Sequence, residues 1–446
     1  MHRLGVLLVL LAAGTFAAAA PADARWTQPI RLESAPGPAA PAAVSIAGRG
    51  DAAVAWATVR DVPSPARWKS CIGEEPPRSD CFPIVAVKVA VYTANREKVT
   101  RTLWQQRMNS SMRIAVVVAR GEVTVAWGYE ERGGGSEIVR VAYGPLKGRW
   151  RPSRVLGHFS DLWFTGGRAP AYPQLAVAPD GSVLAAWSAC RSVKACPRPV
   201  GGVELAWRAP GHGFGAARLV REAPEGAGPV YDASGTAYLS SPCSGRILMS
   251  SPRSRSFARL VTLARGPVSD LALGTSGAGE GLATWVAGAC SSDQAVGNAS
   301  GAVLSSALKG GVFSAPKVIT APGVQAYDAR SAAVPGGGMA SWRTTGSNGV
   351  AVPNLAIVGA PGQFAPVPGA SVPVISDGGG DILFTSAGIW PSEPNRQFVL
   401  PRRGAPPEEA PSATGMLAAA PFARLAADAW SGPGLELSIW RAELLP

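Results

Sequence analysis

Histidine and charged side chains are scarce in this sequence of 446 residues, and their scarcity excludes several classes of chemistry. Only 3 histidines are present and no C-x-x-C pair occurs, so we expect no zinc site, no other metal and no cofactor. The motifs H-E-x-x-H, G-x-G-x-x-G, G-x-S-x-G, the phosphate loop and the calcium loop are missing too. Charged residues make up 16% of the chain without a basic helix or a long basic run, which argues against a nucleic-acid partner.

Long apolar runs are also missing, apart from one at the start. Residues 6–20 are apolar or small, Arg3 supplies a positive charge before them, and Ala22-Asp23-Ala24 follows as a cleavage site. This run is shorter than the about 20 residues that span a bilayer. We therefore predict a signal peptide over residues 1–24 and a secreted, monomeric chain without a transmembrane anchor. A retained anchor is the alternative.

Glycine and proline are plentiful, with 53 and 40 residues, and both disfavour long helices. They suit short strands joined by tight turns. The net charge is +12. Two explanations of this charge stay open. Either it follows from a composition in which Ala, Gly, Pro and Arg are all frequent, or it serves to attract polyanions at a cell surface.

One hairpin pattern recurs along the chain. VSIAGRGDAAVAW at 44–56, AVVVARGEVTVAW at 115–127, LAVAPDGSVLAAW at 175–187 and LAAAPFARLAADAW at 417–430 share an apolar run, a turn and an alternating run that ends in an aromatic residue. Period-two alternation after a turn is typical of a β-hairpin. The aromatic ends of all copies, including weaker ones, fall at positions 56, 127, 187, 238, 285, 342, 384 and 430.

A second hairpin follows each first one, and its last strand often carries proline, as in FSAPKVI from residue 313. Proline marks an edge strand because it cannot donate to a ladder. Four antiparallel strands repeated radially predict an all-β fold, a β-propeller of eight blades, with seven as the alternative. WTQPIRL, from Trp26, has the character of an edge strand, so we expect it to close the last blade. Residues 25–446 would then form a single propeller domain.

The segment LAVAPDGSVLAAW at 175–187 resembles the hairpin of NHL-like and sialidase-like bacterial propellers. No WD dipeptide and no S-x-D-x-G-x-x-W box accompanies it. The resemblance covers nearly the whole chain after residue 24, and it implies the fold without implying an activity.

An even number of cysteines behind a signal peptide favours disulfides. All six are expected in loops between second and third strands, and free buried thiols are the alternative. The predicted pairs are Cys71 with Cys81, Cys190 with Cys196, and Cys243 with Cys290.

Two carboxylates are the candidates for catalysis, because glycosidases need an acid and a base or nucleophile. Asp270 and Asp328 are expected where first strands begin, at the mouth of the central channel, with Gln174 and Arg330 at similar positions. They would serve a glycoside hydrolase or lyase of the sialidase-like kind. The alternative is that both residues cap turns or solvate the channel.

Two inserts offer the better candidates for recognition. Trp68 lies in the long insert of the first blade, and Trp163, Phe164 and Arg168 lie in the connection before the third. Aromatic side chains in loops stack on sugars or fill a partner's pocket, although they could equally pack over the blades as a lid. The sequence thus favours a secreted, non-catalytic binding or scaffold module for a cell-envelope glycan or protein. The enzyme and a purely structural repeat protein remain the alternatives.

Overall fold

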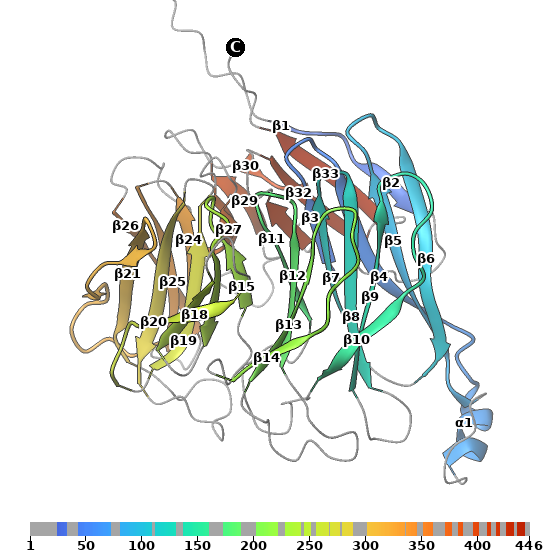
Figure 1. The fold of residues 1–446 in the computed structure, drawn as a ribbon, viewed down its shortest axis with the longest axis horizontal. Coiled ribbons are helices and arrows are strands. Elements are labelled where there is room, and N and C mark those ends of the chain that lie inside the picture. Colours follow the sequence, from blue (N-terminus) through green and yellow to red (C-terminus); the bar gives the residue numbers. More distant parts are fainter. Residues whose placement is uncertain are drawn as a thin grey trace, which may run out of the picture.

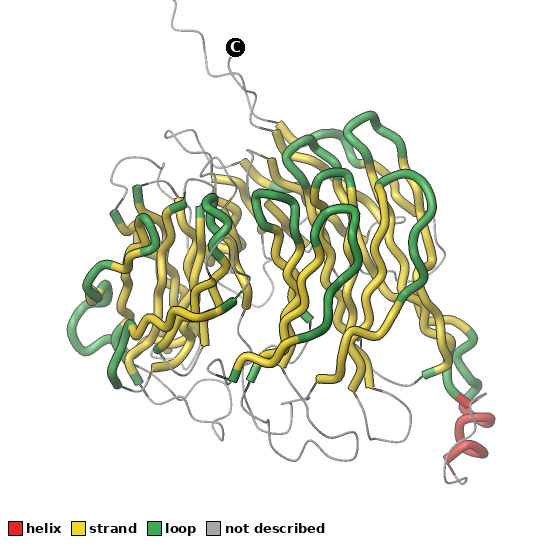
Figure 2. Tube along the Cα trace, viewed as in Figure 1, coloured by secondary structure: helices red, strands yellow, loops and turns green. Residues whose placement is uncertain are grey.

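The computed structural model describes the greater part of the chain. Within it the secondary structure is 33 strands and one helix, and the strands form eight antiparallel sheets (Figures 1 and 2). The described residues are 25–33, 43–72, 81–108, 112–130, 137–159, 173–188, 202–221, 228–241, 245–250, 256–266, 268–276, 279–288, 301–334, 336–345, 351–359, 371–376, 382–386, 396–400, 408–411, 416–419, 425–431 and 435–441.

The first four sheets follow one another along the chain, and we number them as blades. Blade 1 holds β3 (Ala43–Ile46), β4 (Ala52–Arg60), β5 (Ile84–Tyr92) and β6 (Lys98–Arg107). Blade 2 holds β7 (Arg113–Ala119), β8 (Glu122–Glu130), β9 (Glu137–Pro145) and β10 (Arg154–Phe159). Blade 3 holds β11 (Gln174–Val177), β12 (Val183–Ser188), β13 (Val203–Arg208) and β14 (Arg218–Val220). Blade 4 holds β15 (Gly228–Tyr231), β16 (Ala237–Ser241), β17 (Arg246–Ser250) and β18 (Phe257–Thr262).

The remaining sheets continue the same order. Blade 5 holds β19 (Val268–Thr275), β20 (Glu280–Ala287), β21 (Val303–Lys309), β22 (Val312–Phe313) and β23 (Lys317–Val318). Blade 6 holds β24 (Ala326–Val334), β25 (Gly337–Thr345) and β26 (Ala351–Val358). Blade 7 holds β27 (Ser371–Ser376), β28 (Ile382–Ser386), β29 (Arg396–Leu400) and β30 (Glu408–Glu409). Blade 8 holds β31 (Met416–Ala419), β32 (Leu425–Ser431) and β33 (Leu435–Arg441), with β1 (Arg25–Trp26) and β2 (Ile30–Glu33).

The amino-terminal strands complete the last blade, as the sequence predicts. Trp26 lies opposite Trp440 and Ile30 opposite Leu437, both in antiparallel register. Between them, the Thr27 N–H donates to the Ile439 carbonyl at 2.9 Å, and the Ile439 N–H donates to Thr27 Oγ1 at 3.0 Å. The beginning of the described chain is thus hydrogen-bonded to its end, which covers an edge that β33 would otherwise expose.

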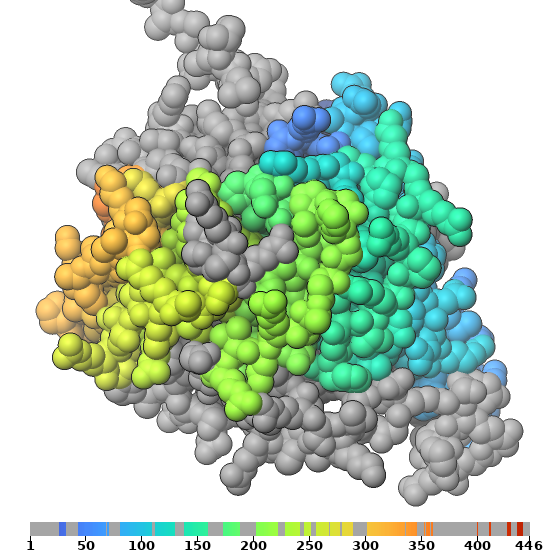
Figure 3. All heavy atoms as spheres, viewed as in Figure 1, coloured from blue at the N-terminus to red at the C-terminus, as the bar shows by residue number. Residues whose placement is uncertain are grey.

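The blades form a ring around a central axis. The first strand of each blade contacts the first strand of the next, from β3 through β7, β11, β15, β19, β24 and β27 to β31, and β31 contacts β3 again. Figure 3 shows blades 1 to 5 packed side by side in chain order across one side of the molecule. Sheets arranged radially with their first strands innermost make a β-propeller, so the predicted fold is confirmed.

The hydrophobic core lies in the seams between blades. The aromatic residues that end the hairpin pattern, Trp56, Trp127, Trp187 and Trp285, are at most 1% exposed. Trp127 packs in a cluster that joins blades 1 and 2, and Trp187 in one that joins blades 2 and 3. The sheets of blades 1, 2 and 3 therefore bury apolar side chains against one another, which explains why the pattern has to recur along the chain.

Two local features differ from the expectation. The first insert contains a helix, α1 (Pro65–Ile72), so Cys71 lies in a helix rather than in a loop. Ser64 Oγ accepts a hydrogen bond from the Arg67 N–H at 3.3 Å, and a serine cap followed by proline is a common helix start. The edge strand predicted from residue 313 is split into β22 and β23, with Pro316 between them.

α1 does not have the length or hydropathy needed to cross a membrane, and no other described segment is a helix.

Candidate functional site

The propeller has two ends with different structures. The turns between first and second strands, and between third and fourth, lie at one end, which we call the hairpin face. α1 and the ends of the second strands lie at the other end, which we call the insert face. In Figure 1, α1 marks the lower, insert face, and the β11–β12 turn lies at the upper, hairpin face.

The predicted aromatic anchors fall mostly outside the described residues. Trp163, Phe164 and Arg168 lie there, and Trp68 belongs to α1 with a side chain that is likewise not described. Cys81 is 4% exposed and disulfide-bonded. The predicted pairing partners stay predictions, because the side chains of Cys71, Cys190, Cys196, Cys243 and Cys290 lie outside the described part.

Asp270 and Asp328 occupy equivalent bulges near the starts of β19 and β24. Both have left-handed backbone, with φ of 56° and 54°. A carboxylate oxygen of Asp270 accepts the backbone N–H of Asp328 at 2.8 Å, so the two residues meet across the seam between blades 5 and 6. Asparagine and aspartate tolerate this backbone better than other non-glycine residues, which accounts for their use in a bulge.

The Asp328 carboxylate is held by two guanidinium groups. Arg330 approaches one oxygen at 3.3 Å, and Arg343 approaches the other at 3.4 Å. Asp270 and Asp328 thus stabilise the backbone and the seam between two blades. Neither lines either of the two cavities described below.

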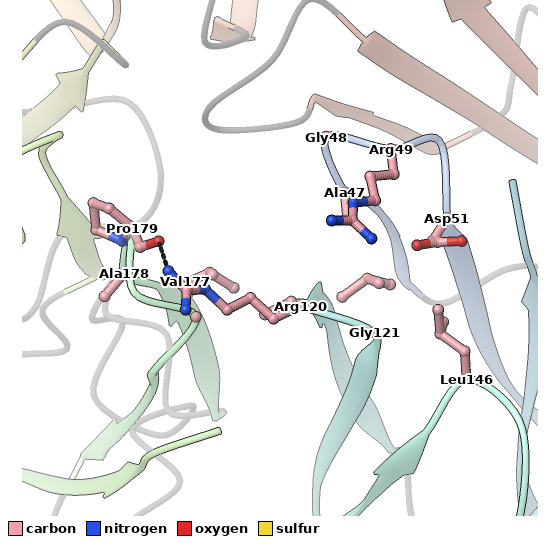
Figure 4. Close-up of a pocket in the computed structure, with 13 residues that line it drawn as sticks. Ala47, Gly48, Arg49, Asp51, Arg120, Gly121, Leu146, Val177, Ala178 and Pro179 are labelled. Atoms are coloured by element: carbon pink, nitrogen blue, oxygen red, sulfur yellow. Dashed lines mark hydrogen bonds between the residues drawn. The ribbon is translucent and has the colours of Figure 1, made fainter. Parts of the chain in front are cut away.

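A cavity of about 630 Å³ opens on the hairpin face, between the first-hairpin turns of blades 1, 2 and 3 (Figure 4). Its lining is mostly alanine, valine, leucine, proline and glycine. Three charged residues interrupt it, namely Arg49, Asp51 and Arg120. We call it the first cavity.

Arg120 reaches this cavity from a two-residue hairpin turn. Arg120 and Gly121 both have positive φ, 45° and 79°, as this turn type requires. The Arg120 guanidinium donates to the Pro179 carbonyl at 3.3 Å. Its aliphatic stem lies over Gly181, where an added Cβ would come within 2.6 Å of the arginine side chain. Arg120 therefore bridges the turns of blades 2 and 3.

Arg49 extends into the same cavity from the turn of blade 1, as Figure 4 shows. Its side chain is exposed, and no other described residue forms a hydrogen bond or ion pair with it. Asp51, on the wall of the cavity, is 8% exposed and accepts the Ala94 N–H at 2.9 Å. Two guanidinium groups thus share a cavity whose carboxylate is already hydrogen-bonded to the backbone.

A second cavity, of about 1030 Å³, lies on the hairpin face between blades 4 and 5. Asp232, Arg259, Glu280 and Lys309 are its charged lining residues. Asp232 is 3% exposed and accepts the Tyr238 hydroxyl at 2.7 Å. Burial, and then the hydrogen bond to Asp232 and the charge of Asp232, raise the pKa of the Tyr238 hydroxyl, so Tyr238 stays a neutral donor.

A half-buried carboxyl lies in the seam of blades 2 and 3. Glu204 accepts the Trp187 indole N–H at 2.8 Å. Burial raises the pKa of the Glu204 carboxyl above its ordinary value of 4.5, and the indole hydrogen bond and the nearby His158 oppose that shift. Gly157 makes room for this pair, because an added Cβ would lie 2.8 Å from the Trp187 ring.

Among the described residues, no group of three or more His, Cys, Asp or Glu side chains lies close enough together to hold a metal ion.

Sequence reasoning missed both hairpin-face cavities. The signal that could have pointed to the first one is the arginine within the turns RGD and ARG, at 49 and 120, together with the net charge of +12. The sequence places those arginines in turns, but it does not say that the turns of three blades enclose a cavity.

No protein-family model matches this sequence, and no curated protein matches it either. Among solved structures, the β-propeller domain of the Trilobed protease from Pyrococcus furiosus superposes with a TM-score of 0.43 at 9% identity, over 84% of this chain and 97% of that chain. A Hadza microbial sialidase gives 0.34 at 10% identity, over 81% and 73%. Virginiamycin B lyase from Staphylococcus aureus gives 0.33 at 9% identity, over 81% and 96%. These similarities are too low to bear on the activity of this chain.

Proposed function

We propose that this protein is an exported, non-catalytic binding module that recognises a cell-envelope glycan or protein through the first cavity of its hairpin face. The observation that supports this most directly is the cavity itself, at about 630 Å³, with Arg49 and Arg120 both extending into it. Ligand sites typically have volumes of about 300 to 1000 Å³, with mostly apolar walls and a few polar groups that fix the ligand.

The chemistry of the cavity favours binding over hydrolysis. Most glycoside hydrolases use two carboxyl groups about 5 to 10 Å apart around the substrate. Among the described residues that line this cavity, Asp51 is the one carboxylate, and it is buried and bonded to the Ala94 N–H. Arginine, by contrast, is well suited to hold a carboxylate or phosphate by paired hydrogen bonds.

The glycoside hydrolase or lyase with Asp270 and Asp328 remains the second candidate. What favours it is that the two residues lie side by side at the innermost strands. The candidate is weakened because both carboxylates already have a structural role. Asp270 accepts a backbone N–H, and Asp328 forms ion pairs with two arginines.

A glycan array combined with a pull-down from envelope extracts, both with the mature protein, tests the proposal. We expect a retained ligand whose binding falls strongly in Arg49→Gln. Loss of binding in Trp163→Ala/Phe164→Ala, with Arg49→Gln unaffected, would move the site to the insert face. Product release from array glycans that disappears in Asp270→Asn/Asp328→Asn would establish the enzyme instead.

A further inference from the structure

The acidic side chains of the hairpin face are nearly all engaged within the protein. Asp180 accepts the Ser182 N–H at 2.8 Å and the Ser182 hydroxyl at 3.0 Å, within its own turn. Glu122 accepts from the buried Arg208 at 2.7 Å and from the Gly211 N–H at 3.1 Å. Glu97 pairs with Lys147 at 2.5 Å. Asp180 and Glu122 thus stabilise a turn and a seam, and all three carboxylates already have a partner within the described chain.

The carboxylates of the second cavity are likewise hydrogen-bonded within the protein. One oxygen of Asp232 accepts the Tyr238 hydroxyl and the other accepts the Ser234 and Thr236 N–H groups, at 2.9 and 3.0 Å. Glu280 accepts the Gly336 N–H, which ties the turn of blade 6 to blade 5. Both carboxylates of this cavity are therefore hydrogen-bonded within the protein.

Several basic side chains at the two cavities, unlike Arg120, are left open to a ligand. Arg49 and Arg259 are exposed, and neither has a hydrogen-bond or ion-pair partner within the described chain. Lys309 is 86% exposed and lies 4.0 Å from Glu280, at the limit of an ion pair. Each cavity thus pairs an engaged carboxylate with at least one unengaged cation.

The linings also limit the class of anion. No aromatic residue is among the described residues that line either cavity. Single-stranded nucleic acids are held mainly by bases stacked on aromatic side chains in a basic groove. Aromatic faces also offer a stacking surface to neutral sugar rings. Arginine and lysine without aromatics suit an anionic group that is bound by charge and hydrogen bonds alone.

The two cavities lie on the same face of one ring, on blades 1 to 3 and on blades 4 and 5. A polymer with a charge on each repeat can occupy both at once, and the second contact then forms at a high effective concentration. We infer that the ligand of this module is an anionic envelope polysaccharide, charged by carboxylate or phosphate groups, that binds at both cavities. This inference rests on the proposed function and names its ligand.

Binding of defined polymers to the mature protein tests it, measured by biolayer interferometry over a range of salt concentrations. The probes are alginate oligomers for carboxylates, a wall teichoic acid for phosphates, dextran as the neutral polymer and oligo-dT as a nucleic acid. The variants are Arg49→Gln, Arg259→Gln and their double. Arg246→Gln is the matched control, because Arg246 is exposed at the insert end of the same blade as Arg259.

We expect alginate or teichoic acid to bind and dextran and oligo-dT not to bind. Affinity should fall as salt rises, and each arginine variant should weaken it on the order of tenfold and lower the salt slope by about 1, with Arg246→Gln unchanged. Which acidic polymer binds identifies the charged group.

Three results would overturn the inference. If dextran or an envelope protein binds and only Arg49→Gln weakens it, the proposed function stands and the anionic polymer across both cavities is wrong. If oligo-dT binds as tightly as the acidic glycans, the ligand class is wrong. If no probe and no envelope component binds, the proposed function fails as well.

Discussion

Arg208 offers the sharpest test of how the seam between blades 2 and 3 is held together. Its side chain is 1% exposed. It donates to Glu122 at 2.7 Å and to Thr124 Oγ1 at 3.0 Å, and its guanidinium lies 5.0 Å from the centre of the Tyr143 ring. Arg208 comes from blade 3 and its three partners from blade 2, so the contacts join two sheets.

Replacing Arg208 by methionine keeps a long side chain and removes the charge. Breaking a fully buried ion pair costs about 3 to 5 kcal/mol, because the remaining charge is left uncompensated. Glu122 is 21% exposed and still accepts the Gly211 N–H, so part of its charge is relieved by water. We therefore expect Arg208→Met to lower the free energy of unfolding by about 2 to 3 kcal/mol.

A double-mutant cycle isolates the pair from the packing. Glu122→Gln alone should cost about 1 to 2 kcal/mol, and the double variant should cost less than the sum by about 1 to 2 kcal/mol. Urea titration followed by tryptophan fluorescence provides the free energies. The control is Lys147→Met, since Lys147 and Glu97 are 52% and 54% exposed, and its effect should stay below about 0.5 kcal/mol. If Arg208→Met costs no more than Lys147→Met, or if the cycle is additive, the buried pair does not hold the seam.

Three further changes probe other parts of the ring. Glu204→Gln keeps an acceptor for the Trp187 indole N–H and removes the titrating group. Because the pKa of Glu204 is raised in the folded state, the wild type should lose stability as pH rises above about 4.5. The variant should lack this loss. Melting curves across pH test this, and an identical pH profile for both proteins would contradict it. Leu32 lies in the closing strand β2 and is 2% exposed. Leu32→Ala should lower the free energy of unfolding, measured by urea titration, by about 2 to 4 kcal/mol. An effect below about 1 kcal/mol would mean that β2 contributes little to stability. Gly274→Ala would place a Cβ 2.9 Å from the Ser331 carbonyl oxygen and from the Ala333 nitrogen, so it should cost about 1 to 3 kcal/mol; an unchanged melting temperature would show that the two strands can separate freely.

The repeat could be predicted because the blades bury their apolar faces with the same sequence pattern. The apolar run, the turn and the terminal tryptophan are local, and Trp56 and Trp127 are fully buried where the pattern put them. The closing strand was predictable for a similar reason, since its edge-strand character is visible in residues 26–32 alone. The helix α1 was not expected, although Ser64 followed by Pro65 is a start signal that could have been used.

The candidate sites depend on contacts that no local pattern contains. The sequence predicted equivalent positions for Asp270 and Asp328, and the structure places both near first-strand starts and links them by a hydrogen bond. The pairing of Asp328 with Arg343 could not be inferred, because Arg343 comes from a neighbouring strand. Likewise, Arg120 and Pro179 are 59 residues apart, and their contact depends on the relative positions of the turns of blades 2 and 3.

The pairing of Trp26 with Trp440 has a consequence for how the protein reaches its folded state. β1 can pair only after β33, more than four hundred residues later in the chain, has been made, and contacts of such sequence separation form slowly. Until then Leu32 and its neighbours stay uncovered, and so does the edge of β33, which makes this the stage at which the chain is most open to aggregation.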